Sequence, residues 1–215
     1  MGRRLTDSLA GVTLAVLDFE YTTPTGAPPE PIEVAVQTLH ARDGELRRGW
    51  TWQALIRPPE HAALTPFDTH QTGITATMLA DRPPAAQVLA ALDAQFTDID
   101  PLVLVAHSAS AEGRILYDQR AHCPHLAHTD LLDTVRLARD RHPDLLRHNL
   151  DTLAAHLRIP VPAARHRAMP DVQLTVDVLL ALINNEIHWP DLRALRTVAG
   201  YPARAAQPEQ GALFG

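Results

Sequence analysis

The stretch GVTLAVLDFE, which begins at Gly11, constrains the fold of this chain more than any other part of the sequence. Its small, aliphatic and β-branched residues predict a strand that is buried on both faces, as in sheets that helices cover on both sides. Two acids, Asp18 and Glu20, stand at the end of the stretch. Because strand side chains alternate, both carboxylates point to one face, at a position where α/β sheets often carry active sites. The alternative is a strand that simply runs into a polar loop.

The first half of the chain contains further segments that resemble strands. Strands are expected at residues 31–40 and 49–56, and the Asp-Gly turn between them favours a hairpin. The segment 57–75 is loop-like in composition, and no glycine-rich phosphate loop of either common type is present. Apolar spacing predicts a helix at 84–96 and a short buried strand at 101–107.

Strands and helices then alternate, which predicts an α/β sheet with helices on its faces. We expect a helix over 108–121 that Ser108 or Ser110 caps, and a strand followed by a helix over 128–140. The remaining expectations are a helix capped by Asn149, a strongly apolar helix at 171–185, a short helix at 190–200 and a flexible tail at 203–215.

Composition excludes several classes of protein. The 215 residues suit one domain, and the formal net charge of −6 argues against a protein that coats nucleic acid non-specifically. No apolar run approaches the ~20 residues of a membrane span. The single cysteine, Cys123, cannot form an intrachain disulfide, and this fits the reducing bacterial cytoplasm. All 19 basic residues are Arg; the seven between Arg136 and Arg167 either contact phosphates or simply line solvated helix faces.

Two further acids lie at the starts of expected helices. Glu112 falls in the first turn of the helix that follows the strand 101–107, and Asp171 opens the helix 171–185. An acid in the first turn interacts favourably with the positive end of the helix dipole. This is the simplest interpretation of both Glu112 and Asp171. Asp171, however, heads a stripe that should face the sheet, where an acid is costly without a cation or a donor. The other members of this stripe are Thr175, Val178 and Leu182.

Four carboxylates from three separate elements can converge at one end of such a sheet. A pair of divalent cations about 3.5–4 Å apart requires several shared carboxylates, and oxygen ligands favour Mg²⁺ or Mn²⁺. His166 lies on the expected loop just before Asp171. Because imidazole titrates near neutrality, His166 could take the proton from an attacking water.

The motifs LDFEYTT, LVAHSASAEGRIL and HRAMPD occur in this order. Together they resemble the three motifs of the DEDDh-type, DnaQ-like 3′–5′ exonucleases, a family that includes the proofreading subunit of bacterial DNA polymerase III, ribonuclease T and oligoribonuclease. The resemblance covers roughly Thr13 to Leu182. It implies a ribonuclease H-like fold with a central mixed sheet, and therefore an exonuclease domain over 1–185 followed by a C-terminal helix and flexible tail over 186–215.

The resemblance also implies two-metal hydrolysis of phosphodiester bonds at 3′ ends, with release of nucleoside monophosphates. The metal ligands carried over by position are Asp18, Glu20, Glu112 and Asp171. Asp18 would bridge both ions, and Glu112 would lie near the second ion, directly or through water. His166 would be the general base.

The chain departs from the family pattern at several positions. Where Glu112 stands the family usually has Asp, and a side chain one methylene longer could alter metal geometry or preference. Ala111 replaces the usual Phe, and Ser108 replaces the usual Asn. Tyr21 stands where the first motif usually has Thr, so either Thr22 or Thr23 takes that place near the terminal nucleotide or Tyr21 stacks on its base. With His107, these residues form the predicted substrate site.

Near the C-terminus the residues QGALF, with Gln210, Leu213 and Phe214, resemble the short peptide by which bacterial replication proteins bind the sliding clamp. A peptide of this kind can bind a hydrophobic groove when it lies on a disordered tail. The sequence contains no polymerase domain, so a proofreading role would act on a polymerase in trans.

Three functions remain open at this point. The leading interpretation is a metal-dependent 3′–5′ exonuclease that favours DNA. An RNA-trimming 3′–5′ exoribonuclease would sense the 2′-hydroxyl near the first motif. A catalytically silent nucleic-acid or clamp-binding module would use the same fold without binding metal at the four acids.

Overall fold

The computed structural model describes residues 9–42, 45–163, 165–184 and 192–206 of the chain. Its centre is a sheet with the strand order β3-β2-β1-β4-β5-β6. The first three strands pair antiparallel, β4 and β5 run parallel to β1, and β6 pairs antiparallel with β5. The bounds are β1 Thr13–Tyr21, β2 Pro31–Arg42, β3 Glu45–Leu55, β4 Leu102–Ala106, β5 Leu131–Asp133 and β6 Gly200–Tyr201.

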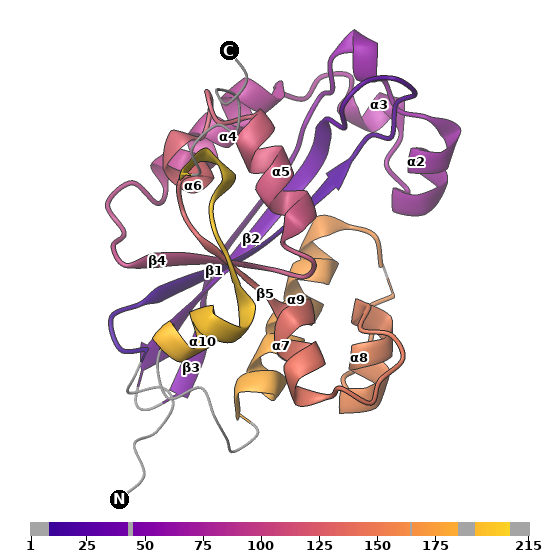
Figure 1. Cartoon of the computed structure of the whole chain (residues 1–215). Helices are drawn as coiled ribbons and strands as arrows, with labels where there is room; N and C mark the ends of the chain where they lie inside the picture. The colour runs from indigo at the N-terminus through magenta and orange to yellow at the C-terminus, as the bar shows by residue number, and fades with distance from the viewer. Residues whose placement is uncertain (1–8, 43–44, 164, 185–191, 207–215) are drawn as a thin grey trace, which may run out of the picture.

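Helices cover both faces of this sheet, as Figure 1 shows. Together the mixed sheet and its helices confirm the predicted α/β class. One face packs against α7 (Thr134–Arg141), α8 (Leu150–Leu157), α9 (Ala168–Asn184) and α10 (Leu192–Ala199). The other packs against α4 (Ala85–Ala94), α5 (Ser110–Asp118) and α6 (Pro124–Ala127).

Strand β1 is buried on both faces, as its sequence predicts. Leu14 and Val16 belong to the core on the α9 side, whereas Leu17 and Phe19 belong to the core on the α5 side. This alternation follows from the period of two in a strand. Asp18 therefore continues the row of Leu14 and Val16, and it reaches the end of the sheet next to α9.

The prediction of a loop over 57–75 is wrong in part. The segment contains the short helix η1 (Glu60–Ala62) and the helix α2 (Pro66–Thr72), and α3 (Ala76–Leu79) follows it. Helix α2 begins with a capping box, in which Thr65 accepts from the Asp68 amide and Asp68 accepts from the Thr65 amide at 2.8 Å. Reciprocal capping stabilises a helix that is too short to show an apolar period.

Two helix starts also differ from the expectation. Helix α9 begins at Ala168 rather than Asp171, because Pro170 lies in the first turn, where a missing amide proton costs little. Neither Ser108 nor Ser110 caps α5, since its N-cap is Ala109 and no side chain accepts there. Ser108 instead adopts a φ of 70° in the turn that leads to this helix. Asn149 caps α8 as predicted, by accepting from the Thr152 amide at 2.9 Å.

The C-terminal part of the described chain packs onto the domain. Leu195 and Ala199 of α10 lie in the core beside α7, and β6 adds an edge strand that the sequence did not indicate. The prediction that a flexible tail begins at residue 203 is wrong at its start, because Ala203 is buried and its amide donates to Asp130. A short 3-10 helix, η2 (Arg204–Ala206), follows. The division of the chain at residue 185 stays a prediction.

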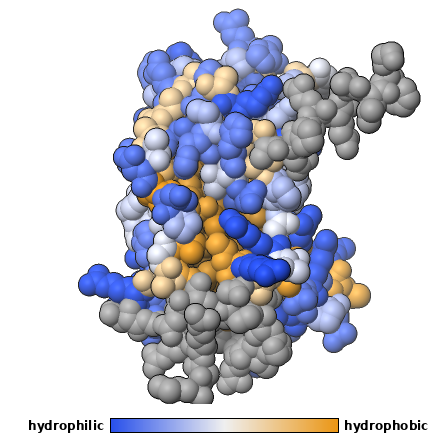
Figure 2. All heavy atoms as spheres, turned by 60° about the vertical axis from the view of Figure 1, so that its left-hand side comes forward, coloured by the Kyte–Doolittle hydropathy of each residue, from blue (hydrophilic) through white to orange (hydrophobic). Residues whose placement is uncertain are grey.

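None of the helices in the described ranges is long and apolar enough to cross a membrane. The face drawn in Figure 2 is largely hydrophilic, with apolar side chains gathered near its centre.

Candidate active site

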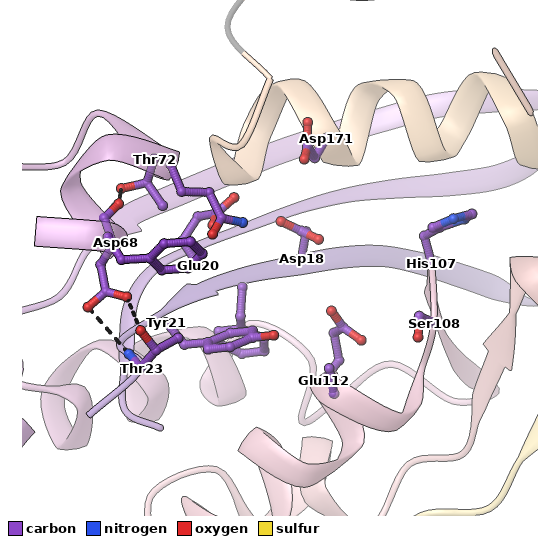
Figure 3. Close-up of a pocket in the computed structure, with 14 residues that line it drawn as sticks. Asp18, Glu20, Tyr21, Thr23, Asp68, Thr72, His107, Ser108, Glu112 and Asp171 are labelled. Atoms are coloured by element: carbon purple, nitrogen blue, oxygen red, sulfur yellow. Dashed lines mark hydrogen bonds between the residues drawn. The ribbon is translucent and has the colours of Figure 1, made fainter. Parts of the chain in front are cut away.

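A cleft of about 380 Å³ opens where β1 ends. Its walls come from the end of β1, from α2, from the start of α5 with its preceding turn, and from the first turn of α9. Helix N-termini from two elements therefore border the cleft, which favours negative charge inside it. Figure 3 shows Asp18 near the centre, with Asp171 on one side and Glu112 on the other.

The acids predicted from the sequence meet in this cleft. Asp18, Glu20 and Asp171 each offer a carboxylate oxygen, and these oxygens lie within 4.8 Å of one another. Glu112 lines the same cleft from α5. Glu20, Glu112 and Asp171 are buried, whereas Asp18 is half-buried. The structure therefore brings together all four residues that the sequence singles out as metal ligands.

Burial and mutual repulsion disfavour the charged forms of these acids. Burial, with repulsion from Glu112 and Glu20 added, raises the pKa of Asp18 well above its usual range. Burial is also the main reason that the pKa of Glu20 rises to about 7 and that of Glu112 to about 8. Without a cation such acids retain protons, and a bound cation would favour their charged forms.

The Oε2 atom of Glu112 is buried and has no hydrogen-bond partner within the described part of the chain. Buried carboxylate oxygens are normally satisfied by donors or by a metal ion. An orphaned oxygen beside three converging carboxylates therefore fits a divalent cation held by oxygen ligands. Glu112 thus places a carboxylate in the cleft at the position where the family pattern has aspartate.

Arg165 lies at the edge of the acid cluster. Its Nη1 atom donates to Asp171 Oδ1, and its Nε atom donates to Asp151 Oδ1 at 2.7 Å. The guanidinium lowers the pKa of both Asp18 and Glu20, against the stronger effect of burial. A positive charge next to the cluster reduces the repulsion among its carboxylates.

The residues predicted to bind substrate divide into two groups. Tyr21, Thr23, His107 and Ser108 line the cleft. Thr22 does not line it, because this residue is fully buried and its Oγ1 accepts from the Glu30 amide at 3.1 Å. A register shift after Glu20 in the β1–β2 ladder accompanies this change of direction.

His107 is a neutral, oriented ring. Its Nδ1 lies 2.8 Å from Thr134 Oγ1, and burial lowers its pKa to about 4. Nε2 has no partner within the described residues. The ring can therefore act as a hydrogen-bonding group but not as a cation at neutral pH.

His166 lies outside the lining of the cleft. The residue is exposed and has a φ of 62°, in the left-handed region that non-glycine residues seldom adopt. Its neighbours Arg165 and Arg167 both bind acids, so the chain is held on either side of the histidine. The role of His166 as general base stays a prediction.

Helix α2 contributes a wall that sequence reasoning missed. Phe67, Asp68, Gln71 and Thr72 all line the cleft. Asp68 accepts from Thr23 Oγ1 at 2.6 Å and so ties the end of β1 to this helix, as the dashed lines in Figure 3 show. The T-P-x-D pattern at Thr65 was the available signal, because it marks a helix N-terminus.

The raised pKa values predict how stability depends on pH. Between the ordinary pKa near 4.5 and the folded values of about 7 and 8, Glu20 and Glu112 keep protons that the unfolded chain releases. The metal-free protein should therefore become less stable as the pH rises from about 5 to about 8. Thermal unfolding in EDTA across this range checks the sign, and Glu112→Gln should flatten the slope. A wild-type Tm that rises over the same range would contradict the raised pKa values of Glu20 and Glu112 in the folded protein.

Comparison with known proteins identifies the family. Residues 15–179 match the model of the exonuclease family RNase_T. The PolC-type DNA polymerase III of Oceanobacillus iheyensis is 31% identical over 179 residues, which is 80% of this chain but 11% of that protein. The corresponding protein of Bacillus subtilis is 28% identical over 181 residues, or 80% of this chain and 12% of the relative. The chain thus spans about a tenth of the length of these curated relatives.

Solved structures share the fold. The nuclease domain of 3′hExo, a DEDDh family member bound to rAMP, superposes with a TM-score of 0.66 at 18% identity, covering 81% of this chain and 92% of that one. Exonuclease X in complex with 5′ overhanging duplex DNA gives a TM-score of 0.62 at 21% identity, covering 86% and 98%. The family match, the acid cluster and the mixed sheet agree, and the chain belongs to the exonuclease family RNase_T.

Proposed function

We propose that this exonuclease hydrolyses phosphodiester bonds at the 3′ ends of nucleic acids and releases nucleoside monophosphates, with DNA favoured over RNA. The observation that carries the proposal is the cluster of carboxylate oxygens from Asp18, Glu20 and Asp171 within 4.8 Å of one another. The unpartnered oxygen of Glu112 on the opposite side of Asp18 supports it.

Two divalent cations, Mg²⁺ or Mn²⁺, fit this donor set. Asp18 would be shared between them, Glu20 and Asp171 would complete the first site, and Glu112 would serve the second. When bound, such ions supply charge stabilisation for the scissile phosphate and for the leaving oxygen. The side chains themselves orient the substrate and move the proton.

His166 would accept the proton of the attacking water. Because it is exposed and does not line the cleft, the segment around it must turn toward the cleft when substrate binds. Catalytic groups on loops commonly reach their working geometry only in the complex. The 3′-terminal nucleotide would lie against Tyr21 and Phe67, with Thr23, His107 and Ser108 as polar contacts.

The arginine-rich segment offers phosphate contacts upstream of the cleft. Three of its arginines already have partners. Arg136 donates to the carbonyl of Gly200. Arg165 pairs with Asp171, and Arg167 pairs with Glu33. Arg139 and Arg147 are exposed, line a separate cavity of about 600 Å³, and form no ion pair with the described residues. They are therefore the arginines best placed to contact the backbone of a longer strand.

DNA is favoured because the curated relatives are DNA polymerase III proteins and because Exonuclease X was solved with duplex DNA. The structure of 3′hExo with rAMP supports the alternative, an RNA-trimming 3′–5′ exoribonuclease. A silent binding module remains a second alternative, motivated by Glu112 and by Tyr21 in the first motif.

The experiment that tests the proposal compares 5′-labelled DNA and RNA strands of the same sequence with Mg²⁺, with Mn²⁺ and with EDTA. We expect a ladder that shortens from the 3′ end only with metal, and faster loss of DNA. Strands that carry a single 3′-terminal ribonucleotide place any 2′-hydroxyl effect at the first nucleotide. Early release of the 5′ label as a mononucleotide would contradict the proposed direction.

Partners other than nucleic acid also stay predictions. Gln210, Leu213 and Phe214 of the clamp-like peptide lie outside the described residues. Binding to a sliding clamp that survives Leu213→Ala combined with Phe214→Ala would remove this idea. We also propose action on a polymerase in trans and residence in the bacterial cytoplasm.

A further inference from the structure

Three hydrogen bonds converge on Glu33, a buried carboxylate of β2. Arg167 Nε donates to Oε2 at 2.9 Å, and Arg167 Nη2 donates to Oε1 at 2.7 Å. The backbone amide of Ala168 also donates to Oε2, at 3.0 Å. Glu33 is only 4% exposed, so these bonds satisfy a charge that water does not reach. We call this arrangement of Glu33, Arg167 and Ala168 the Glu33 clamp.

The Glu33 clamp adjoins the acid cluster without belonging to it. Glu33 pairs directly with Glu20 across the β1–β2 ladder, and partners in such a ladder point to the same face. Burial, and next repulsion from Glu33, raise the pKa of Glu20, whereas Arg167 lowers it. Both oxygens of Glu33 already accept bonds, unlike the free oxygen of Glu112. Glu33 therefore anchors the backbone at Arg167 and Ala168 and is not a further metal ligand.

The clamp grips the chain immediately after His166. Arg167 is the next residue, and Ala168 is the first residue of α9. Asp171 follows three residues later, in the first turn of the same helix. One buried carboxylate thus fixes the point where the His166 loop joins the helix that carries an acid of the cluster.

The chain is held on both sides of His166, by Arg165 before it and by the Glu33 clamp after it. The φ of 62° at His166 turns the chain sharply, and the residues on its C-terminal side cannot slide because of the clamp. Any movement of His166 toward the cleft must then turn at His166 itself or break the surface pair of Arg165 with Asp151. Because the chain is fixed next to His166, the imidazole can reach fewer positions. Efficient proton transfer requires a catalytic group to be held in such a narrow range of positions.

We propose that Glu33 is a positioning residue for the proton-transfer step, acting through Arg167 and Ala168 on His166. This inference rests on the proposed function, since it assumes that His166 takes part in hydrolysis. Bidentate geometry is essential to it, because a lysine at 167 could not make two parallel bonds, and an aspartate at 33 is one methylene too short.

The test is a double-mutant cycle in single-turnover cleavage at saturating Mn²⁺. Glu33→Gln and Arg167→Gln should each lower the cleavage rate by about 10- to 100-fold, the loss that small misplacements of catalytic groups cause. In a His166→Ala background neither should cost more than about twofold further, because the group they position is gone. Arg167→Gln should also lower the Tm, because it removes two of the donors to the buried carboxylate of Glu33. The rates are therefore compared at saturating Mn²⁺ and at a temperature at which every variant is folded.

Asp177→Asn is the matched control. Arg48 Nη2 binds Asp177 Oδ1 at 2.5 Å, so this variant also breaks a link between the sheet and α9, but far from His166. It should keep the wild-type rate. If Glu33→Gln does not fold, Arg167→Gln decides, because it leaves the bond between Glu33 and Ala168 in place.

The outcomes separate the inference from the function that it assumes. Absence of cleavage by the wild-type protein removes the proposed function and the inference with it. Cleavage that is unaffected by His166→Ala removes the base and the inference but keeps the nuclease. If cleavage depends on His166 but Arg167→Gln keeps the full rate, the positioning role of Glu33 is overturned and the proposed function stands. The same conclusion follows if Arg167→Gln lowers the rate as much in the His166→Ala background as it does in the wild type.

Discussion

Asp18→Asn should lower the rate of strand cleavage by about a thousandfold or more, because metal ions at such sites supply several kcal/mol of transition-state stabilisation. Asp18 lies between Asp171 and Glu112, so its carboxylate is the one that both sides of the site can share. Asparagine keeps the shape of the side chain but removes its charge. The loss should appear with Mg²⁺ and with Mn²⁺ alike.

The same substitution should not harm the fold. Burial and the neighbouring acids raise the pKa of Asp18, which means that its charge is destabilising in the metal-free protein. The Tm of Asp18→Asn in EDTA should therefore equal or exceed that of the wild type. Asp177→Asn, an acid of α9 outside the cleft, is the control and should cleave normally. Full activity of Asp18→Asn would show that the cluster is not the catalytic site.

His166→Ala should lower the rate of cleavage by about 10²- to 10⁴-fold, the range that general base catalysis usually contributes. KM and Mn²⁺ affinity should stay close to the wild-type values, because His166 is outside the acid cluster and the cleft lining. This split between kcat and KM distinguishes a proton acceptor from a residue that binds substrate.

His122→Ala serves as the control for this substitution, since His122 is exposed and lies beyond α5, away from the cleft. Added imidazole should restore part of the activity of His166→Ala and should not accelerate the wild type. If His166→Ala cleaved at the wild-type rate across pH 6 to 9, His166 would not be the base, and His107, which lines the cleft, would be the next histidine to test.

The sequence predicted the parts of the site that depend on local pattern. The apolar run that ends at Asp18 and Glu20 indicated a buried strand with two acids at its end, and β1 has that form. The stripe on α9 that starts at Asp171 is buried along its length, as the helical period implied. Spacing within one element is a short-range property, so a single sequence reveals it.

Contacts between distant segments could not be predicted in the same way. Glu33 looks like an ordinary polar residue in a strand, and its partner Arg167 lies 134 positions away. The choice between Thr22 and Thr23 depended on a register shift in the β1–β2 ladder. Strand β6 has only two residues, and it forms because α10 delivers it to the edge of β5. Each of these features requires the whole fold.

The acid cluster contains a longer side chain at position 112 than the aspartate of the family pattern. Glu112 reaches the same cleft as Asp18 from the first turn of α5, and one of its oxygens remains without a hydrogen-bond partner there. The extra methylene changes how the carboxylate approaches but not what it offers. Metal preference, rather than the presence of metal, is the property that this substitution should influence.

The most direct measurement is a calorimetric titration of Mn²⁺ into the metal-free wild-type protein, Asp18→Asn and Asp177→Asn at pH 8. We predict binding with release of protons in the wild type and in Asp177→Asn, because the raised pKa of Glu112, about 8, leaves protons for the metal to displace. Binding in Asp18→Asn should be abolished or much weaker. Equal Mn²⁺ binding by all three proteins, or by none, would contradict the assignment of this cleft as the metal-dependent active site of the exonuclease.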